Sequence, residues 1–182
     1  MTSTFTISGW RQRLARSLHL SRSKPEAKYI QLATLNDEGF VQNRTLVFRG
    51  FIDESDHLIM ITDTRSDKFQ ALQAHSQAEI CWYFAKTREQ YRLSGNIKIF
   101  ANTSDVRTSV WNKISPTAKS QFYWYLDDQL VNELGSNNSI PDTFCVLLLE
   151  TQQVDYLLLA DHHKRIKCQL INDKWQEINI NP

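Results

Sequence analysis

The stretch between residues 44 and 68 places cations and hydroxyls beside two apolar segments. The cations are Arg44, Arg49, Arg65 and Lys68, and the hydroxyls belong to Thr62, Thr64 and Ser66. Arginine forks and hydroxyls together supply the donors that a phosphate dianion needs. Ser66 also stands near the start of a predicted helix, whose free N–H groups attract anions. The stretch therefore predicts a phosphate site; the alternative is a set of solvated charges at a strand end and a helix start.

Apolar periodicity places this stretch within a mainly antiparallel sheet. Strands are expected at 29–35, 40–51, 57–62, 78–84, 90–101, 143–150, 154–160, 165–171 and 174–180. Helices are expected at 65–75, from Ser104 to Ile114, and after Pro116, the last carrying Phe122, Trp124 and Leu126. Gly39 is suited to the positive φ of a hairpin turn. The predicted fold class is β-rich, a barrel of mainly antiparallel strands with a few helices.

Trp10, Leu14 and Leu18 recur every four residues near the N-terminus, with arginines between them. This spacing predicts an amphipathic helix. We expect it to dock on the domain or on a dimer partner. A membrane surface is the alternative, but the apolar face is short and narrow for that purpose.

Length and composition limit the classes of protein to which this chain can belong. At 182 residues and 41% apolar content, the chain is expected to form one domain with a sizeable core. A net charge of +1 gives no general attraction to nucleic acid. The sequence has no 18-residue apolar run and no signal-peptide pattern, so no membrane partner and a cytoplasmic location are expected. Its three scattered cysteines do not form a disulfide or CxxC metal pattern.

Several motifs, in order and spacing, resemble the flavin-binding core of the pyridoxamine 5'-phosphate oxidases and their relatives. In that family an arginine opens a strand and a basic residue follows five positions later, as Arg44 and Arg49 do here. Ile61-Thr62-Asp63 stands for the family's tyrosine-threonine-asparagine stretch, and Ser66-Asp67-Lys68 for its serine-arginine-lysine stretch. Arg88-Glu89-Gln90 through Gly95 stands for the turn and strand that follow.

The resemblance implies an FMN-binding split β-barrel and a homodimer with a flavin site at its interface. Gln90 matches a glutamine that often contacts the flavin of the neighbouring subunit. The implied cofactor-binding residues are Arg44, Arg49, Ile61, Thr62, Arg65, Ser66, Lys68 and Gln90. The single domain would comprise a basic N-terminal helix at 1–28, a flavin-binding core at 29–101, and helices and strands at 102–182.

The chain also departs from the family pattern. Asp67 stands where the family usually has a cation, and Leu157 where it has a tryptophan. The 164–168 segment keeps positive charge but lacks the histidine and final arginine of the family motif. These departures bear on which substrate the protein binds more than on which cofactor it binds.

We therefore expect an FMN-dependent oxidoreductase whose partner is a small-molecule substrate or electron donor, with no catalytic side chain assigned. The flavin would carry the redox chemistry. A non-catalytic FMN-binding or sensory protein is one alternative, and a split barrel that binds no flavin is another.

Two further clusters have structural explanations. Asp161-His162-His163 lacks a third spaced ligand, and adjacent side chains diverge on a strand, so no metal site is expected. The aromatic run from Phe122 to Tyr125 is expected in core or interface packing, with a substrate pocket as the alternative. No Ser-His-Asp or Cys-His set for nucleophilic catalysis is evident.

Overall fold

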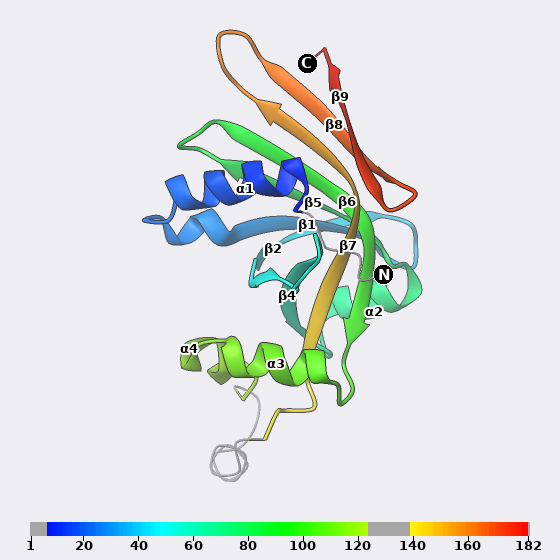
Figure 1. Ribbon diagram of the computed structural model, residues 1–182. Coiled ribbons are helices and arrows are strands. Elements are labelled where there is room, and N and C mark those ends of the chain that lie inside the picture. Colours follow the sequence, from blue (N-terminus) through cyan, green and yellow to red (C-terminus); the bar gives the residue numbers. More distant parts are fainter. Residues whose placement is uncertain (1–6, 124–138, 182) are drawn as a thin grey trace, which may run out of the picture.

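The computed structural model describes residues 7–123 and 139–181. In this part of the chain a single antiparallel sheet dominates the fold (Figure 1). Its strands are β1 (Tyr29–Leu35), β2 (Val41–Val47), β3 (Gly50–Phe51), β4 (Leu58–Asp63), β5 (Gln77–Phe84), β6 (Glu89–Phe100), β7 (Phe144–Leu158), β8 (Lys164–Ile171) and β9 (Lys174–Ile180). The helices are α1 (Gly9–Leu20), the 3-10 helix η1 (Pro25–Lys28), α2 (Asp67–Ala74), α3 (Asp105–Lys113) and α4 (Pro116–Ser120).

Strand β7 is the spine of the sheet. It pairs with β6 along most of its length, with β4 over its first half and with β8 over its second half. The strand order β2-β1-β5-β6-β7-β4-β3 leaves β2 and β3 at opposite ends, unpaired with each other. The sheet curls without closing, so the predicted split barrel is confirmed.

The register between β6 and β7 shifts at Gly95. A Cβ atom at this position would lie 2.1 Å from the backbone oxygen of Glu150, so only glycine fits there. On β7 the shift lies in the gap between the two strands that were expected at 143–150 and 154–160. That expectation of two strands is wrong: pairing with β6 continues past the bulge and makes β7 a single strand.

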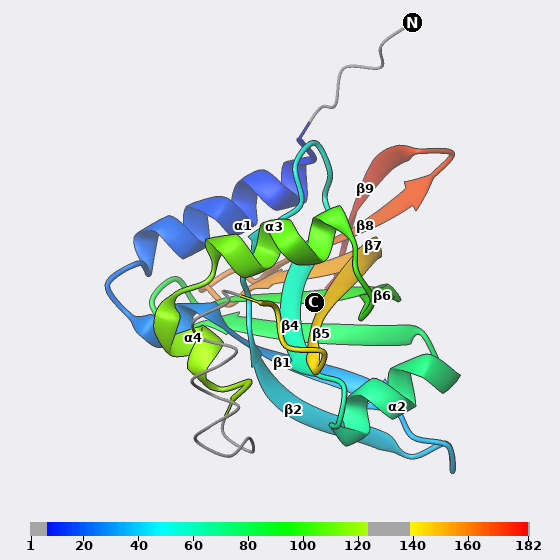
Figure 2. The ribbon, with the colours of Figure 1, turned by 90° about the horizontal axis from the view of Figure 1, so that it is seen from below.

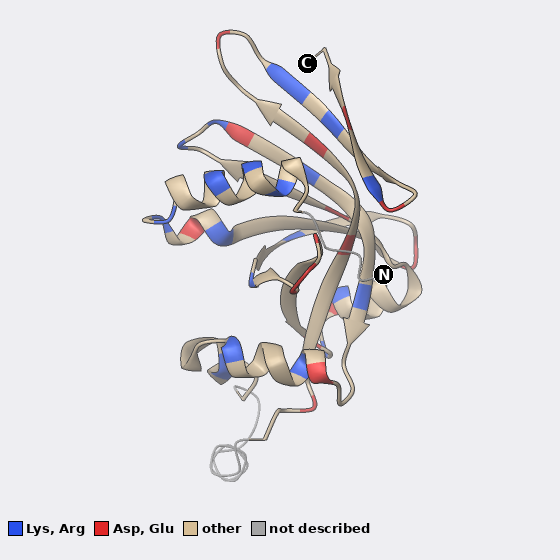
Figure 3. Ribbon diagram, viewed as in Figure 1, with Lys and Arg blue, Asp and Glu red and all other residues tan. Residues whose placement is uncertain are grey.

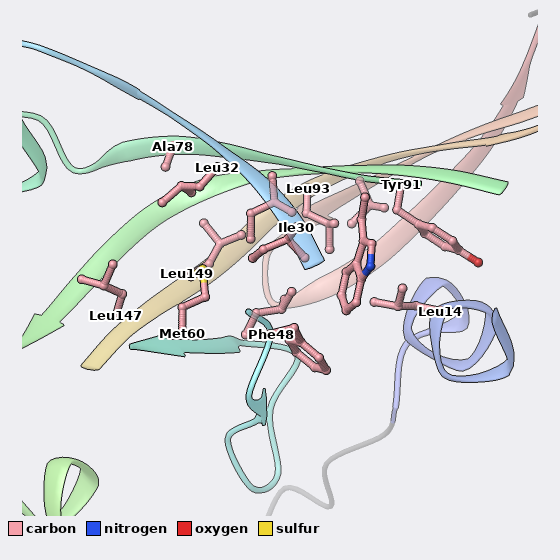
Figure 4. Packing of buried hydrophobic residues seen from close by; sticks show 14 of the residues in the cluster. Leu14, Ile30, Leu32, Phe48, Met60, Ala78, Tyr91, Leu93, Leu147 and Leu149 are labelled. Carbon is pink, nitrogen blue, oxygen red and sulfur yellow. The ribbon is translucent and has the colours of Figure 1, made fainter. Parts of the chain in front are cut away.

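The main core fills the inside of the barrel (Figure 4). Ile30, Leu32, Met60 and Leu93 are fully buried there, each on a strand whose burial alternates with period two. Leu149 is buried beside them on β7, whose first six residues are all buried. Burying one such side chain stabilises the fold by roughly 1.5–3 kcal/mol. The inward face of the sheet is thus the main source of stability, and the outward face remains available for function.

Helix α1 closes one side of the barrel, as its predicted amphipathic pattern requires. Trp10 and Leu14 have no exposed surface and pack into the main core. Its Ser17 hydroxyl donates to the buried Glu89 carboxylate over 2.6 Å, and the Tyr156 hydroxyl donates to the other oxygen over 2.8 Å. The helix is therefore fixed to the first residue of β6, and docking on the domain is confirmed.

Helices α3 and α4 cover a second, smaller core beneath β4 and β7. Val110, Trp111, Phe122 and Phe144 are buried in it, with the Trp111 and Phe144 ring centroids 4.8 Å apart. Figure 2 shows α3 and α2 on different sides of β4. The two helices thereby frame the strand that carries the predicted site.

Two predicted elements differ from the structure. The strand expected at 40–51 is broken into β2 and β3 at Phe48 and Arg49, because the Phe48 ring turns into the core. The helix after Pro116 ends at Ser120, so Phe122 packs from a turn; Trp124 and Leu126 lie outside the described residues. Across 7–123 and 139–181, no helix has the length and apolar character needed to span a membrane.

Candidate functional site

A cavity of about 670 Å³ lies between β2, β4 and the start of α2, and we call it the β4 cavity. Its volume is in the range of small-molecule and cofactor sites. Six of the eight predicted cofactor residues line it: Arg49, Ile61, Thr62, Arg65, Ser66 and Lys68. The structure thus brings together residues from three separate elements that sequence reasoning had grouped by motif alone.

Thr62, Ser66 and Lys68 form one polar end of the β4 cavity. The Lys68 Nζ atom lies 3.2 Å from the Thr62 Oγ1 atom, and the Ser66 hydroxyl lies 3.2 Å from the same oxygen. Ser66 is the N-cap of α2, but its side chain makes no capping bond to that helix. The positive end of α2 therefore faces the same region as the lysine, an arrangement that suits an anion.

The charge of Lys68 is poorly compensated. Burial lowers the pKa of Lys68, and the nearby charge of Arg44 lowers it further, against the opposing effects of Asp63 and Asp67. A phosphate group placed here would replace lost hydration with charge-assisted hydrogen bonds. The site is thus electrostatically prepared for an anion.

Arg44 lies beside the β4 cavity and is absent from its lining. Its guanidinium donates to the Thr34 hydroxyl over 2.6 Å and to the Gln42 side-chain oxygen over 3.1 Å. Burial lowers the pKa of Arg44, while the charge of Asp67 acts to raise it. Arg44 therefore braces β2 against β1 and adds positive potential next to Lys68.

Arg65 reaches the cavity from the turn after β4 and makes a two-pronged ion pair with Asp63, at 2.9 and 2.6 Å. Burial acts to raise the pKa of the Asp63 carboxyl, but the hydrogen bonds and charge of Arg65 outweigh it and hold that pKa below its usual value. The pair stiffens the turn that presents Ser66.

Arg49 marks the other end of the β4 cavity. Its Nε atom is buried and has no hydrogen-bond partner in the described part of the chain. Burial lowers the pKa of this guanidinium. A buried donor without a partner is costly, so this arrangement favours a ligand with an acceptor atom.

Arg49 also lines a second cavity of about 560 Å³, which we call the α3 cavity. It lies between β3, β4 and α3, with Phe48, Phe51 and Ile59 on one wall and Val106, Val110 and Ile114 on the other. Sequence analysis predicted the helix from Ser104 to Ile114, whose residues Val106, Val110 and Ile114 share one apolar face, but missed the cavity. The detectable signal was charge next to that face, with Asp105 and Lys113 at opposite ends of the helix (Figure 3).

Gln90 lies far from both cavities within the chain. It is the second residue of β6 and pairs with Tyr83 and Leu157, whereas Thr62 pairs with Cys145 at the other end of β7. The twelve residues between Cys145 and Leu157 correspond to about 40 Å of extended strand. A flavin contact from Gln90 would therefore require a second copy of the chain, and its predicted role stays a prediction.

Asp161, His162 and His163 belong to the turn between β7 and β8. No group of three or more potential metal-ligating His, Cys, Asp or Glu side chains occurs within 7–123 and 139–181. Phe122, from the predicted aromatic run, both packs in the smaller core and lines the β4 cavity. Core packing, the first explanation for the aromatic run, thus applies to Phe122, and the substrate-pocket alternative stays a prediction.

Residues 7–101 match the family described as "Pyridoxamine 5'-phosphate oxidase, FMN-binding domain". These residues contain α1 and every predicted cofactor residue. The C-terminal strands and α3 lie outside the match, as do the departures from the family motifs at Leu157 and at 164–168, whereas the departure at Asp67 lies within it.

Full-length relatives extend the similarity. The chain is 29% identical over 195 residues to pyridoxine/pyridoxamine 5'-phosphate oxidase 2 of Arabidopsis thaliana, covering 97% of this chain and 98% of that protein. A crystal structure of a pyridoxamine 5'-phosphate oxidase-related, FMN binding protein from Nostoc punctiforme is 37% identical, with a TM-score of 0.85 and coverage of 97% and 100%.

A more distant structure shares the fold alone. PhzG from Burkholderia lata, solved with tetrahydrophenazine-1-carboxylic acid, is 19% identical with a TM-score of 0.74, covering 94% of this chain and 90% of that one.

Proposed function

Because the chain belongs to the pyridoxamine 5'-phosphate oxidase family of FMN-binding domains, with FMN as the indicated cofactor, we propose that it is an FMN-dependent oxidoreductase acting on a small molecule. In this proposal the flavin occupies the β4 cavity and the substrate occupies the α3 cavity. The observation that carries the proposal is that Arg49 lines both cavities.

The residues of the β4 cavity fit FMN. Thr62, Ser66 and Lys68 would hold the phosphate, and Ile61 and Arg49 would contact the ring. Arg49 hydrogen-bonds through its backbone to Ile59, three residues before Thr62, which corresponds to about 10 Å along β4. A phosphate at the lysine end thus leaves the ring directed toward Arg49.

When bound, FMN supplies a ring that takes up a hydride from a substrate or donor. The protein's own contribution is to bind, orient and exclude water. Arg49 lines both cavities, and its buried Nε has no hydrogen-bond partner within the described residues. The apolar walls of the α3 cavity would hold a substrate against Arg49. No side chain is assigned as a catalytic acid or base.

We also propose a homodimer in which Gln90 completes the partner's flavin site. The outward face around Gln90 supports this proposal, since the neighbouring Tyr83 is 49% exposed. The same face carries an ordered charge network, with Arg92 bound to Glu79 and Arg165 bound to Asp155. A preformed polar surface with an exposed aromatic is suited to a second copy of the chain.

The second cavity is what favours an enzyme over a non-catalytic FMN-binding or sensory protein, because a flavin carrier has no need of it. The test is to purify the protein, record its flavin absorption, and mix the FMN-loaded form anaerobically with candidate donors. Bleaching of the flavin followed by recovery on addition of oxygen is the expected result for an oxidase. Bound FMN that no donor reduces at a catalytic rate would favour the non-catalytic alternative.

A further inference from the structure

The α3 cavity has its own charge balance. Lys28, Arg49 and Lys113 line it together with Asp53 and Asp105. Three cations face two carboxylates, which leaves an excess of one positive charge. This count covers the lining within the described residues.

The β4 cavity differs. Its lining holds Arg49, Arg65 and Lys68 against the single carboxylate of Asp63, an excess of two. Two positive charges suit a phosphate, which carries between one and a half and two negative charges at neutral pH. Arg49 belongs to both linings. When its charge is assigned to the α3 cavity, that cavity has an excess of one positive charge and suits an anion of one charge.

The walls of the α3 cavity restrict the shape of that anion. Phe48 and Phe51 are in edge contact with centroids 5.2 Å apart, and both line the cavity opposite α3. Val106, Val110 and Ile114 form the facing wall. Aromatic and aliphatic side chains on both walls favour an apolar body, and the flat faces of the rings suit a planar one.

We propose that the α3 cavity selects a planar, apolar monoanion of the aromatic carboxylate class over the corresponding phosphate ester. Arg49, whose buried Nε lacks a partner, would bind the carboxylate through its planar fork. A dianion would exceed the positive charge available and be repelled by Asp53 and Asp105. This inference rests on the proposed function, because it names the substrate class of the same site.

The test uses two ligands that share one ring and differ in the anion, 2-naphthoate and 2-naphthyl phosphate. Calorimetric titration into the FMN-loaded protein at pH 8 is expected to show naphthoate binding about tenfold more tightly, the order expected for one uncompensated charge in a partly solvated site. A phosphate monoester has a second pKa near 6, so naphthyl phosphate loses its second negative charge at pH 5. The difference in affinity between naphthoate and naphthyl phosphate should therefore be smaller at pH 5 than at pH 8.

A matched pair of variants tests the charge balance. Replacing both lining carboxylates, in the double variant Asp53→Asn and Asp105→Asn, should move the preference at pH 8 severalfold toward naphthyl phosphate. The double variant Asp37→Asn and Glu38→Gln removes the same two negative charges at exposed positions in the β1–β2 turn, outside both cavities, and should leave the preference unchanged. Far-ultraviolet circular dichroism confirms that each variant is folded.

The outcomes separate the two proposals. Equal or tighter binding of naphthyl phosphate to the unaltered protein, binding of neither ligand, or a folded double variant with unchanged preference would overturn the inference. Calorimetry detects these ligands with or without flavin. Failure to take up FMN would instead overturn the proposed function.

Discussion

Lys68 donates a hydrogen bond to Thr62 across the turn between β4 and α2, with Nζ 3.2 Å from Oγ1. The turn is short, so the end of the strand and the start of the helix present their donors to one point. Because these donors are preorganised, an anion that binds there has little side-chain freedom left to remove. The contact joins two residues that we propose hold the flavin phosphate.

The first prediction is that FMN binds in preference to riboflavin and that Lys68→Met removes most of this preference. A charge-assisted hydrogen bond contributes roughly 1.5–3 kcal/mol, so FMN affinity should fall at least about tenfold while riboflavin affinity stays the same. Quenching of flavin fluorescence measures both constants. Lys174→Met, at an exposed position on β9, is the matched control. Equal affinities of the unaltered protein for FMN and riboflavin would exclude a phosphate site in the β4 cavity.

The second prediction concerns alkaline pH. Burial and the charge of Arg44 lower the pKa of Lys68 below its ordinary 10.5. A phosphate favours the protonated amine, so the ratio of FMN to riboflavin affinity should fall as pH rises through that lowered pKa, before a free lysine would titrate. The cofactor-free protein should gain stability over the same window, since the folded state then no longer holds a buried ammonium.

Lys68→Arg provides the control for this pH dependence. An arginine remains charged throughout, so the affinity ratio in this variant should change little in the alkaline range. The ratio cancels any titration of the flavin ring itself. A decline of the same size in the variant would assign the effect to another group.

Local spacing explains why this part of the site was predictable. Thr62, Ser66 and Lys68 lie within seven consecutive residues, so a strand followed by a helix places them together whatever the rest of the fold does. The α3 cavity was missed because Arg49 and Lys113 meet only through the packing of a helix beneath a distant strand. Such long-range contacts leave no periodic trace in a single sequence.

The strand pattern has a similar limit. Alternation correctly predicted most strands, but β7 was divided at 151–153, where its polar residues lie at the register shift with β6. The extra residue at that shift, Gln152, belongs to β7 itself, so the break was a β-bulge and not a chain turn. The reason for a glycine at position 95 became visible only when Glu150 was placed beside it.

The third prediction tests that close approach. Gly95→Ala should destabilise the fold by about 3 kcal/mol, because the new Cβ would lie 2.1 Å from a backbone oxygen that cannot easily move. Gly39→Ala is the comparison, since Gly39 has a φ of 82° but open space around it. Its expected cost is about 1 kcal/mol from backbone strain alone. Urea unfolding measures the loss of unfolding free energy in each variant. Similar losses would show that β6 and β7 move apart easily enough to admit the extra methyl group.

The fourth prediction is that the protein forms a homodimer and that FMN stabilises it. A ligand that contacts both subunits favours the dimer by mass action. Light scattering over a dilution series, with and without FMN, should show dissociation at lower concentration when FMN is present. Gln90→Ala should weaken this linkage, while Gln169→Ala on β8 serves as an exposed glutamine control. A monomer with fully bound FMN would contradict the interfacial site.

The last prediction is that pyridoxine and pyridoxamine 5'-phosphates are poor substrates or not substrates. Leu157, where the family has a tryptophan, offers neither a flat surface nor an N–H donor. Arg165 is the cation best placed to replace the lost contacts, but it is bound to Asp155 at 2.9 and 2.6 Å. While this ion pair is intact, Arg165 does not provide a new binding site for the substrate phosphate. A misplacement of about 1 Å can cost on the order of a hundredfold in rate.

Formation of pyridoxal phosphate under air, assayed at steady state with FMN-saturated protein, measures this directly. We expect kcat/KM well below about 10⁴ M⁻¹s⁻¹, the low end of ordinary enzymes. Asp155→Asn frees Arg165 from its ion pair, so any residual activity should rise if that arginine can reach a substrate phosphate. A value of about 10⁴ M⁻¹s⁻¹ or above for the unaltered protein would show that Leu157 and the altered 164–168 segment still support the family reaction.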